Sequence, residues 1–353
     1  MARPYDVAGT GRGPRGPVVP VLAGRRGRYG VPVSETASPP RRGRFLRAVA
    51  AFTVLLAVAG YLAVRFGADD IGPPRCTARA AEPSDGEIRT YEMSPEQAAN
   101  AATISAVGTT RGMPERAVTI ALATALQESA LRNIDYGDRD SVGLFQQRPS
   151  KGWGTVEQIL DPAYSAGQFY TKLAEVPGYY RLPLTDAAQR VQRSAFPLAY
   201  AKHEPDATVL SAALTGKAAA TLTCTGGGDG EPGDAAAVRA ALTRDFGSKV
   251  LPGGAGSDPG AKVAEAGGQA GGEPVGTTGP SEVTVPVKSA DTARGWEFAH
   301  WAVAHSAELR IAEVSVGDRV WSVAKSGQGW RKTGGESGTA RPGGNDVRLR
   351  IAQ

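Results

Sequence analysis

The chain has 353 residues, 41% of them hydrophobic, so it is long enough for two modest domains with packed cores. Its net charge of +5 is uneven, because residues 1–66 hold 11 arginines against Asp6 and Glu35, which leaves the remainder mildly acidic. A mildly acidic body argues against nucleic-acid binding, which needs a basic face to meet phosphates. The 46 glycines and 25 prolines exceed what a compact enzyme needs, so part of the chain is expected to be linker.

The N-terminal region has two parts. Residues 1–44 are rich in Arg, Gly and Pro and almost lack large apolar residues, which predicts a disordered basic tail. Ala48–Val64 is an uncharged, mostly apolar run between Arg47 and Arg65, and it predicts a single transmembrane helix at 45–66. The upstream arginines then place the N-terminus in the cytoplasm and the rest outside the cell membrane. A cleaved signal peptide, giving a secreted protein, is the alternative.

The first folded element is expected after a short stalk at 67–90. Ser94 is a good N-cap, Pro95 suits the first helical position, and Gln97 completes a capping box. A helix is therefore predicted from there to about residue 107.

The second helix, predicted over 114–131, is apolar on nearly every side. Such a helix is typical of the centre of a domain. Glu128 lies near its end, on the face that carries the small residues Ala121, Thr124 and Ala125. Those small side chains would let other elements approach closely beside the acid.

The region 91–224 is predicted to be one mainly α-helical domain, with further helices at 161–173, 185–194 and 206–214. The two cysteines, Cys76 and Cys224, bracket it. In an oxidising compartment they would form one disulfide, whereas two unpaired buried thiols are the alternative.

The rest of the chain is predicted to be a linker and a small α+β domain. Residues 225–281 are dominated by Gly, Ala, Pro and Ser, with room for one short helix at 234–246. In residues 282–353, short strands are expected at 283–287, 314–316, 319–321 and 347–351, with a helix over 294–309.

Glu128 is the candidate catalytic residue. A glutamate near a helix end is usually a solvated surface residue. In a partly apolar cleft, however, its charged form is disfavoured, so its pKa rises and it can hold a proton near neutral pH. A protonated carboxyl beside a glycosidic oxygen is the general acid that sugar-chain cleavage requires.

The combination of Glu128-Ser129 with Ser141-Val142-Gly143-Leu144-Phe145-Gln146 resembles the lysozyme-like superfamily. It is closest to soluble lytic transglycosylases and goose-type lysozymes, in an exported actinobacterial form. The resemblance covers about residues 94–215. It implies a lysozyme-like fold, with Glu128 protonating the oxygen between N-acetylmuramic acid and N-acetylglucosamine in peptidoglycan glycan strands. Lytic transglycosylation is the favoured reaction, and a hydrolytic muramidase or a non-enzymatic peptidoglycan-binding or divisome scaffold are the alternatives.

The remaining site candidates lie in the turn after Glu128 and further along the predicted domain. A second acid, needed only for hydrolysis, would be Asp138 or Asp140, or else Asp135, although aspartates beside Gly137 are also ordinary turn residues. Tyr200 occupies the family's aromatic position near the acid, but Ala201 replaces the usual asparagine after it. The candidate substrate-binding residues are Ser141, Gly143, Gln146, Gln147, Trp153 and Tyr200.

The segment 282–353 resembles a small domain of actinobacterial wall hydrolases that often ends in His-x-Asp-His-Val-His. Here Gly344–Leu349 occupies that place without a histidine, and His300 and His305 are five residues apart, so they do not converge on a metal. We therefore expect no metal or cofactor, and a non-catalytic module that docks to a cell-wall or divisome protein. His203 is expected to be structural.

Overall fold

The computed structural model describes eight stretches of the chain: 41–67, 72–83, 86–193, 197–226, 230–252, 281–288, 290–333 and 346–353. Most of the predicted basic tail and half of the predicted linker lie outside these residues. The chain divides into two compact units, Met1–Tyr61 and Leu62–Gln353. They are described separately.

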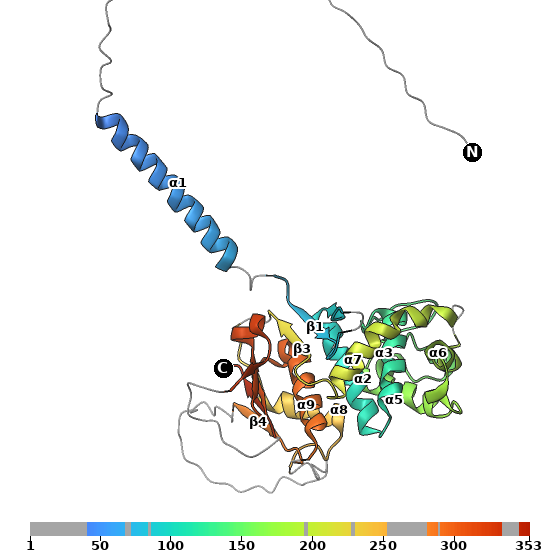
Figure 1. Cartoon of the computed structure of the whole chain (residues 1–353). Coiled ribbons are helices and arrows are strands. Elements are labelled where there is room, and N and C mark those ends of the chain that lie inside the picture. Colours follow the sequence, from blue (N-terminus) through green and yellow to red (C-terminus); the bar gives the residue numbers. More distant parts are fainter. Residues whose placement is uncertain are drawn as a thin grey trace, which may run out of the picture. The chain divides into compact units, whose positions relative to one another are not determined.

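The helix α1 (Arg41–Gly67) contains the apolar run that predicted a transmembrane anchor at 45–66 (Figure 1). No helix among the described residues is long and apolar enough to cross a membrane, so the prediction of a transmembrane helix is wrong. The uncharged run between Arg47 and Arg65 has only 17 residues. A span needs about 20 predominantly apolar residues, and this one is shorter and rich in alanine.

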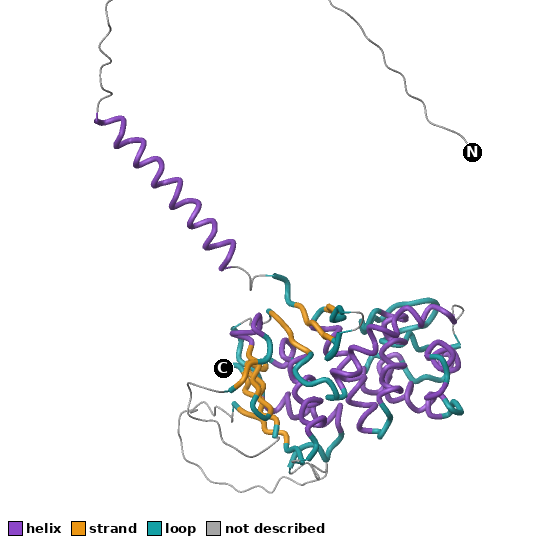
Figure 2. Tube along the Cα trace, in the orientation of Figure 1, coloured by secondary structure: helices purple, strands orange, loops and turns teal. Residues whose placement is uncertain are grey.

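The second unit contains a mostly helical body, drawn largely in purple in Figure 2, and α3 contacts most of its other helices. The sides of α3 are contacted by α2, α5, α6, α7 and the 3₁₀ helix η3, and its residues from Ala117 to Leu126 are buried. The body's helices are α2 (Pro95–Thr110), α3 (Glu115–Ser129), α4 (Val156–Ile159), α5 (Pro162–Ala174), α6 (Leu184–Gln192) and α7 (Glu204–Leu214), with the 3₁₀ helices η1 (Pro149–Lys151), η2 (Tyr179–Arg181) and η3 (Pro197–His203).

Side-chain caps set the starts of α2, α4 and α5. Ser94 and Gln97 form the predicted capping box of α2, and the Asp161 side chain accepts hydrogen bonds at the start of α5. The helix predicted over 185–194 is α6, which begins at Leu184 after Pro183 and ends at Gln192. Proline suits a helix start because it needs no amide partner there.

A small antiparallel sheet lies at the edge of the body. It has the order β2-β1-β3, built from β1 (Arg75–Arg79), β2 (Thr90–Met93) and β3 (Leu222–Thr225). Cys76 is paired with Cys224 across β1 and β3, and the two form the chain's disulfide. The disulfide prediction is therefore confirmed. Residues 75–79 are a strand and not part of a stalk, because both β2 and β3 pair with them.

The C-terminal part builds an antiparallel sheet of order β4-β8-β5-β6-β7. Helix α8 (Ala235–Phe246) precedes this sheet in the chain and is capped by Asp234, so the short helix expected within the linker is present. The strands are β4 (Glu282–Val285), β5 (Ile311–Val316), β6 (Arg319–Ser322), β7 (Arg331–Lys332) and β8 (Val347–Ile351), with α9 (Thr292–Ala304), α10 (Ser306–Leu309) and the 3₁₀ helix η4 (Val323–Gln328) between them.

Helix α9 joins this sheet to the helical body. It contacts β5 and β8 as well as α2, α7 and β3, and its residues from Glu297 to Ala304 are buried all round. The helix predicted over 294–309 is broken at His305 into α9 and α10. The fold class therefore needs correcting: within Leu62–Gln353 the helices and both small sheets form one compact unit, with orange α9 beside α8 in Figure 1.

Candidate active site

Glu128 lies in the last turn of α3, where the chain makes a sharp turn. Ala130 and Leu131 both have positive φ, 53° and 60°, a conformation that non-glycine residues adopt uncommonly. Side chains of α2 hold the turn: Gln97 Nε2 donates to the Ala130 carbonyl at 2.7 Å and Asn100 Nδ2 to the Leu131 carbonyl at 2.8 Å. The end of the central helix is thereby fixed in place around the acid.

The Glu128 carboxyl is partly buried and hydrogen-bonded. Tyr200 Oη donates to Glu128 Oε1 at 2.6 Å, and the Gln192 side chain also hydrogen-bonds the carboxyl. Burial raises the pKa of Glu128 above its usual value, and these two hydrogen bonds oppose the rise without cancelling it. The arrangement keeps a proton on Glu128 to higher pH than on a solvated glutamate.

Hydrogen bonds to backbone carbonyls hold the loop that follows α3. Ser129 Oγ donates to the Leu144 carbonyl at 2.8 Å, and the Gly143 N–H donates to the Ile134 carbonyl at 2.6 Å. Gly143 has φ +77°, and a Cβ there would meet the Ile159 carbonyl at 2.8 Å. The glycine is therefore required by both its backbone conformation and the close approach of α4. Its role in the fold is structural.

The two neighbouring glutamines differ in what they contact. Gln147 is 1% exposed, and its Nε2 donates to the Ser165 carbonyl at 3.0 Å. Its predicted role in substrate binding therefore needs correcting to a structural one. Gln146 is partly exposed with φ 46°, and its Nε2 donates to the Tyr136 carbonyl at 3.2 Å. Ser141 is 7% exposed.

The three aspartates of the turn differ in their contacts. Asp140 accepts from Arg148 Nε at 2.6 Å and from the Ser150 N–H at 2.8 Å. These hydrogen bonds from Ser150 and Arg148 hold the pKa of Asp140 well below its usual range. Asp138 has a 90% exposed side chain, 3.9 Å from Arg139 Nε, and Asp135 is exposed.

The aromatic candidates also separate by burial. Tyr200 is fully buried and donates to Glu128, so its ring is not exposed for stacking on a sugar. Trp153 is partly buried against the core, with Lys172 Nζ 4.9 Å from its ring centroid. Tyr170 is a core residue that donates to the Ile104 carbonyl at 3.0 Å.

The three histidines each have a structural contact. His300 is fully buried, and its Nδ1 donates to the Ala213 carbonyl at 2.7 Å; burial lowers its pKa to about 4. His305 Nε2 lies 3.7 Å from Asp245, whose carboxyl also accepts from Thr103 and Trp301. His203 Nε2 lies 3.2 Å from Gln127 Oε1. Within the described parts of the chain, no group of three or more His, Cys, Asp or Glu could hold a metal ion.

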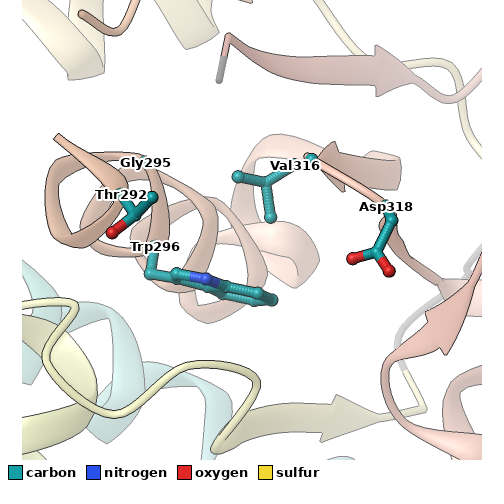
Figure 3. Close-up of a pocket in the computed structure, with 6 residues that line it drawn as sticks. Thr292, Gly295, Trp296, Val316 and Asp318 are labelled. Atoms are coloured by element: carbon teal, nitrogen blue, oxygen red, sulfur yellow. The ribbon is translucent and has the colours of Figure 1, made fainter. Parts of the chain in front are cut away.

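A small pocket lies in the C-terminal part, between the start of α9 and the β5–β6 turn (Figure 3). Its volume is about 180 Å³. In the close-up, the Trp296 ring faces Val316 and Asp318 across the pocket. The lining residues are Thr292, Gly295, Trp296, Val316, Gly317 and Asp318.

The same C-terminal part has a similarity to a known family. Residues 281–341 match the model of the VldE C-terminal domain. The matched segment runs from the start of β4 beyond β7 and contains the whole pocket. No curated protein matches the chain. The residues around Glu128 are outside the matched segment.

Sequence reasoning missed Gln192 as a site residue. Nothing in the local sequence indicates that it meets Glu128. A second missed signal is backbone strain: five of the seven described non-glycine residues with positive φ lie near the site in sequence or space. They are Ala130, Leu131, Arg139, Gln146 and Arg193. Strained residues cluster at functional sites.

Proposed function

We propose that the chain cleaves the glycosidic bond between N-acetylmuramic acid and N-acetylglucosamine in peptidoglycan, with Glu128 as the general acid. The observation that carries the proposal is the state of this carboxyl. It is partly buried, its pKa is raised, and it is held by Tyr200 at the end of a buried helix. A glutamic acid that keeps its proton near neutral pH is the group that glycosidic cleavage needs.

In the proposed reaction, Glu128 donates its proton to the glycosidic oxygen as the bond from that oxygen to C1 of the muramic acid breaks. The 6-hydroxyl of the same sugar then bonds to C1 and returns its proton to Glu128. The product is a 1,6-anhydro end, and the acid is regenerated. Tyr200 donates to Oε1, so we place the transferable proton on the other carboxyl oxygen.

Asp140 supports transglycosylation over hydrolysis. An inverting hydrolase needs a second carboxylate to activate water. Both oxygens of Asp140 already accept hydrogen bonds, from Arg148 and Ser150, and its low pKa makes it a weak base. We further propose that the protein acts outside the cytoplasm, since structural disulfides such as Cys76–Cys224 persist in oxidising compartments.

The test is mass spectrometry of purified peptidoglycan digested by the full chain and by Glu128→Gln. We expect 1,6-anhydromuramic ends from the unmodified protein and at least a 100-fold loss of product from the variant, which cannot donate the proton. Reducing muramic ends would instead identify a hydrolytic muramidase. Equal product from both proteins would contradict the role of Glu128 as the acid. No product from either protein would favour a non-enzymatic peptidoglycan-binding scaffold.

A further inference from the structure

Gln192 occupies the end of α6 next to a strained turn. The following residue, Arg193, has φ 52° and ends the helix by donating from its N–H to the Gln189 carbonyl at 2.8 Å. From this position, Gln192 Nε2 donates to the Phe145 carbonyl at 2.7 Å. Gln192 thereby ties α6 to the Gly143–Gln146 loop that is fastened beside Glu128.

The hydrogen bond to Phe145 fixes which way the Gln192 amide points. A carbonyl can only accept, so the NH₂ group and not Oε1 faces Phe145. This NH₂ group has a second hydrogen. The Gln192 side chain also hydrogen-bonds the Glu128 carboxyl, as a donor that favours its charged form. One amide group therefore serves both the loop and the acid.

The other end of the amide indicates that this contact serves more than packing. Gln192 Oε1 is buried and has no hydrogen-bond partner. An unsatisfied buried acceptor is destabilising, and a methionine of similar shape would avoid the penalty. The fold tolerates the penalty at a glutamine whose amide also bonds the Phe145 carbonyl and Glu128.

We propose that Gln192 is a positioning residue for the acid, holding the Glu128 carboxyl in line with the Gly143–Gln146 loop. The inference rests on the proposed function. Tyr200 holds the carboxyl from η3 and Gln192 holds it from α6. Once Glu128 has given up its proton, the two donors stabilise the partly buried carboxylate, which assists proton donation and keeps the anion aimed at the hydroxyl that reprotonates it.

The experiment compares the full chain with Gln192→Met, which keeps the side-chain length and removes both donors. Gln168→Met on α5 is the matched control. The first readout is the titration of the Glu128 carboxyl by ¹³C NMR, with its resonance identified by its absence in Glu128→Gln. The second is the pH dependence of kcat and KM on soluble peptidoglycan fragments.

We expect Gln192→Met to titrate Glu128 at higher pH than the unmodified chain, because a donor that favours the carboxylate is lost. The alkaline limb of kcat should move upward in pH, and kcat at neutral pH should fall about tenfold with KM nearly unchanged. Gln168→Met should match the unmodified chain. Packing alone would not move the titration of Glu128.

An unchanged Glu128 titration and pH profile in Gln192→Met, with the unmodified chain active, would overturn the role of Gln192 and leave the proposed function standing. An inactive unmodified chain would overturn the proposed function, even if the titration moves. If Gln192→Met fails to fold, the same two measurements are made on Gln192→Asn. Asparagine keeps the amide group but is shorter by one methylene, so the amide no longer reaches Glu128.

Discussion

The Glu128 carboxyl lies where its charged form is disfavoured. This predicts that replacing it with a neutral side chain removes activity but stabilises the fold. Burial raises its pKa in the folded chain, so its contribution to stability is complete below the pKa of an unfolded glutamate and is lost as pH rises through the folded pKa. Glutamine imitates the protonated form at every pH. Glu128→Gln should therefore increase the free energy of unfolding at neutral pH by about 0.5–2 kcal/mol, the range of single stabilising substitutions.

The measurement is urea denaturation of both proteins between pH 3.5 and pH 8. The difference in stability should be near zero at the acidic end and grow as pH rises. Glu92→Gln is the control, because Glu92 is exposed on β2, and it should change stability by less than about 0.5 kcal/mol. A Glu128→Gln protein that is less stable than the original at neutral pH would contradict the assignment of Glu128 as a destabilising, functional acid.

Residues of the site were predictable only where the sequence itself brings them together. Glu128 and Gly143 lie within one short stretch, and the Ser129–Leu144 hydrogen bond spans 15 positions. Gln192 meets Phe145 across 47 positions and Tyr200 meets Glu128 across 72. Tyr200 was found through the family resemblance, whereas Gln192 has no local signal because its position depends on how α6 packs.

Among the elements, α9 depends on a glycine in another part of the fold. Gly216 follows α7 with φ +74°, and a Cβ there would lie 1.8 Å from the Ala293 carbonyl and 2.7 Å from the Glu297 nitrogen. These are backbone atoms of α9 that cannot move aside independently of the helix. Gly216→Ala should therefore push α9 off the helical body and lower the free energy of unfolding by at least about 2 kcal/mol beyond its conformational cost.

Gly178→Ala isolates that conformational cost. Gly178 also has positive φ, +65°, but no atom lies within 4 Å of its built Cβ. It should lose about 1–2 kcal/mol from the left-handed backbone alone. Both variants are measured by urea denaturation, and the difference between their losses of unfolding free energy is the cost of the clash with α9. Equal losses would mean that α9 does not press on Gly216.

Elements were predictable where their signals are local. The caps at Ser94, Asp161 and Asp234 each act within three residues, so those helices were found. The sheet of β1 and β3 was not found, because Cys76 and Cys224 are 148 residues apart. Helix α9 is buried all round because the helical body packs on it as well as the sheet.

On the scale of the whole molecule, polar contacts cross between the helical body and the C-terminal part at buried or partly buried sites. Asp245 on α8 accepts from Thr103 on α2 and from Trp301 on α9, both at 2.8 Å. Trp330 donates from its indole to the Leu222 carbonyl at 2.8 Å. If the two parts separated, these polar groups would lose their hydrogen-bond partners, or they would be exposed to water together with the apolar side chains around them. Either outcome is costly, so the two parts should unfold as one cooperative unit.

That cooperativity can be tested without deleting anything. A protease recognition sequence inserted between residues 265 and 266 allows the folded chain to be cut once within the stretch 253–280. Because α9 is buried against α2 and α7, the two fragments should stay associated after cutting and elute together in size-exclusion chromatography. In the Gly216→Ala background the same cut should release the C-terminal fragment or weaken its retention, since the clash opposes the contact that holds it. Fragments that separate from the unmodified cut chain would show instead that the sheet and α9 form an independent domain.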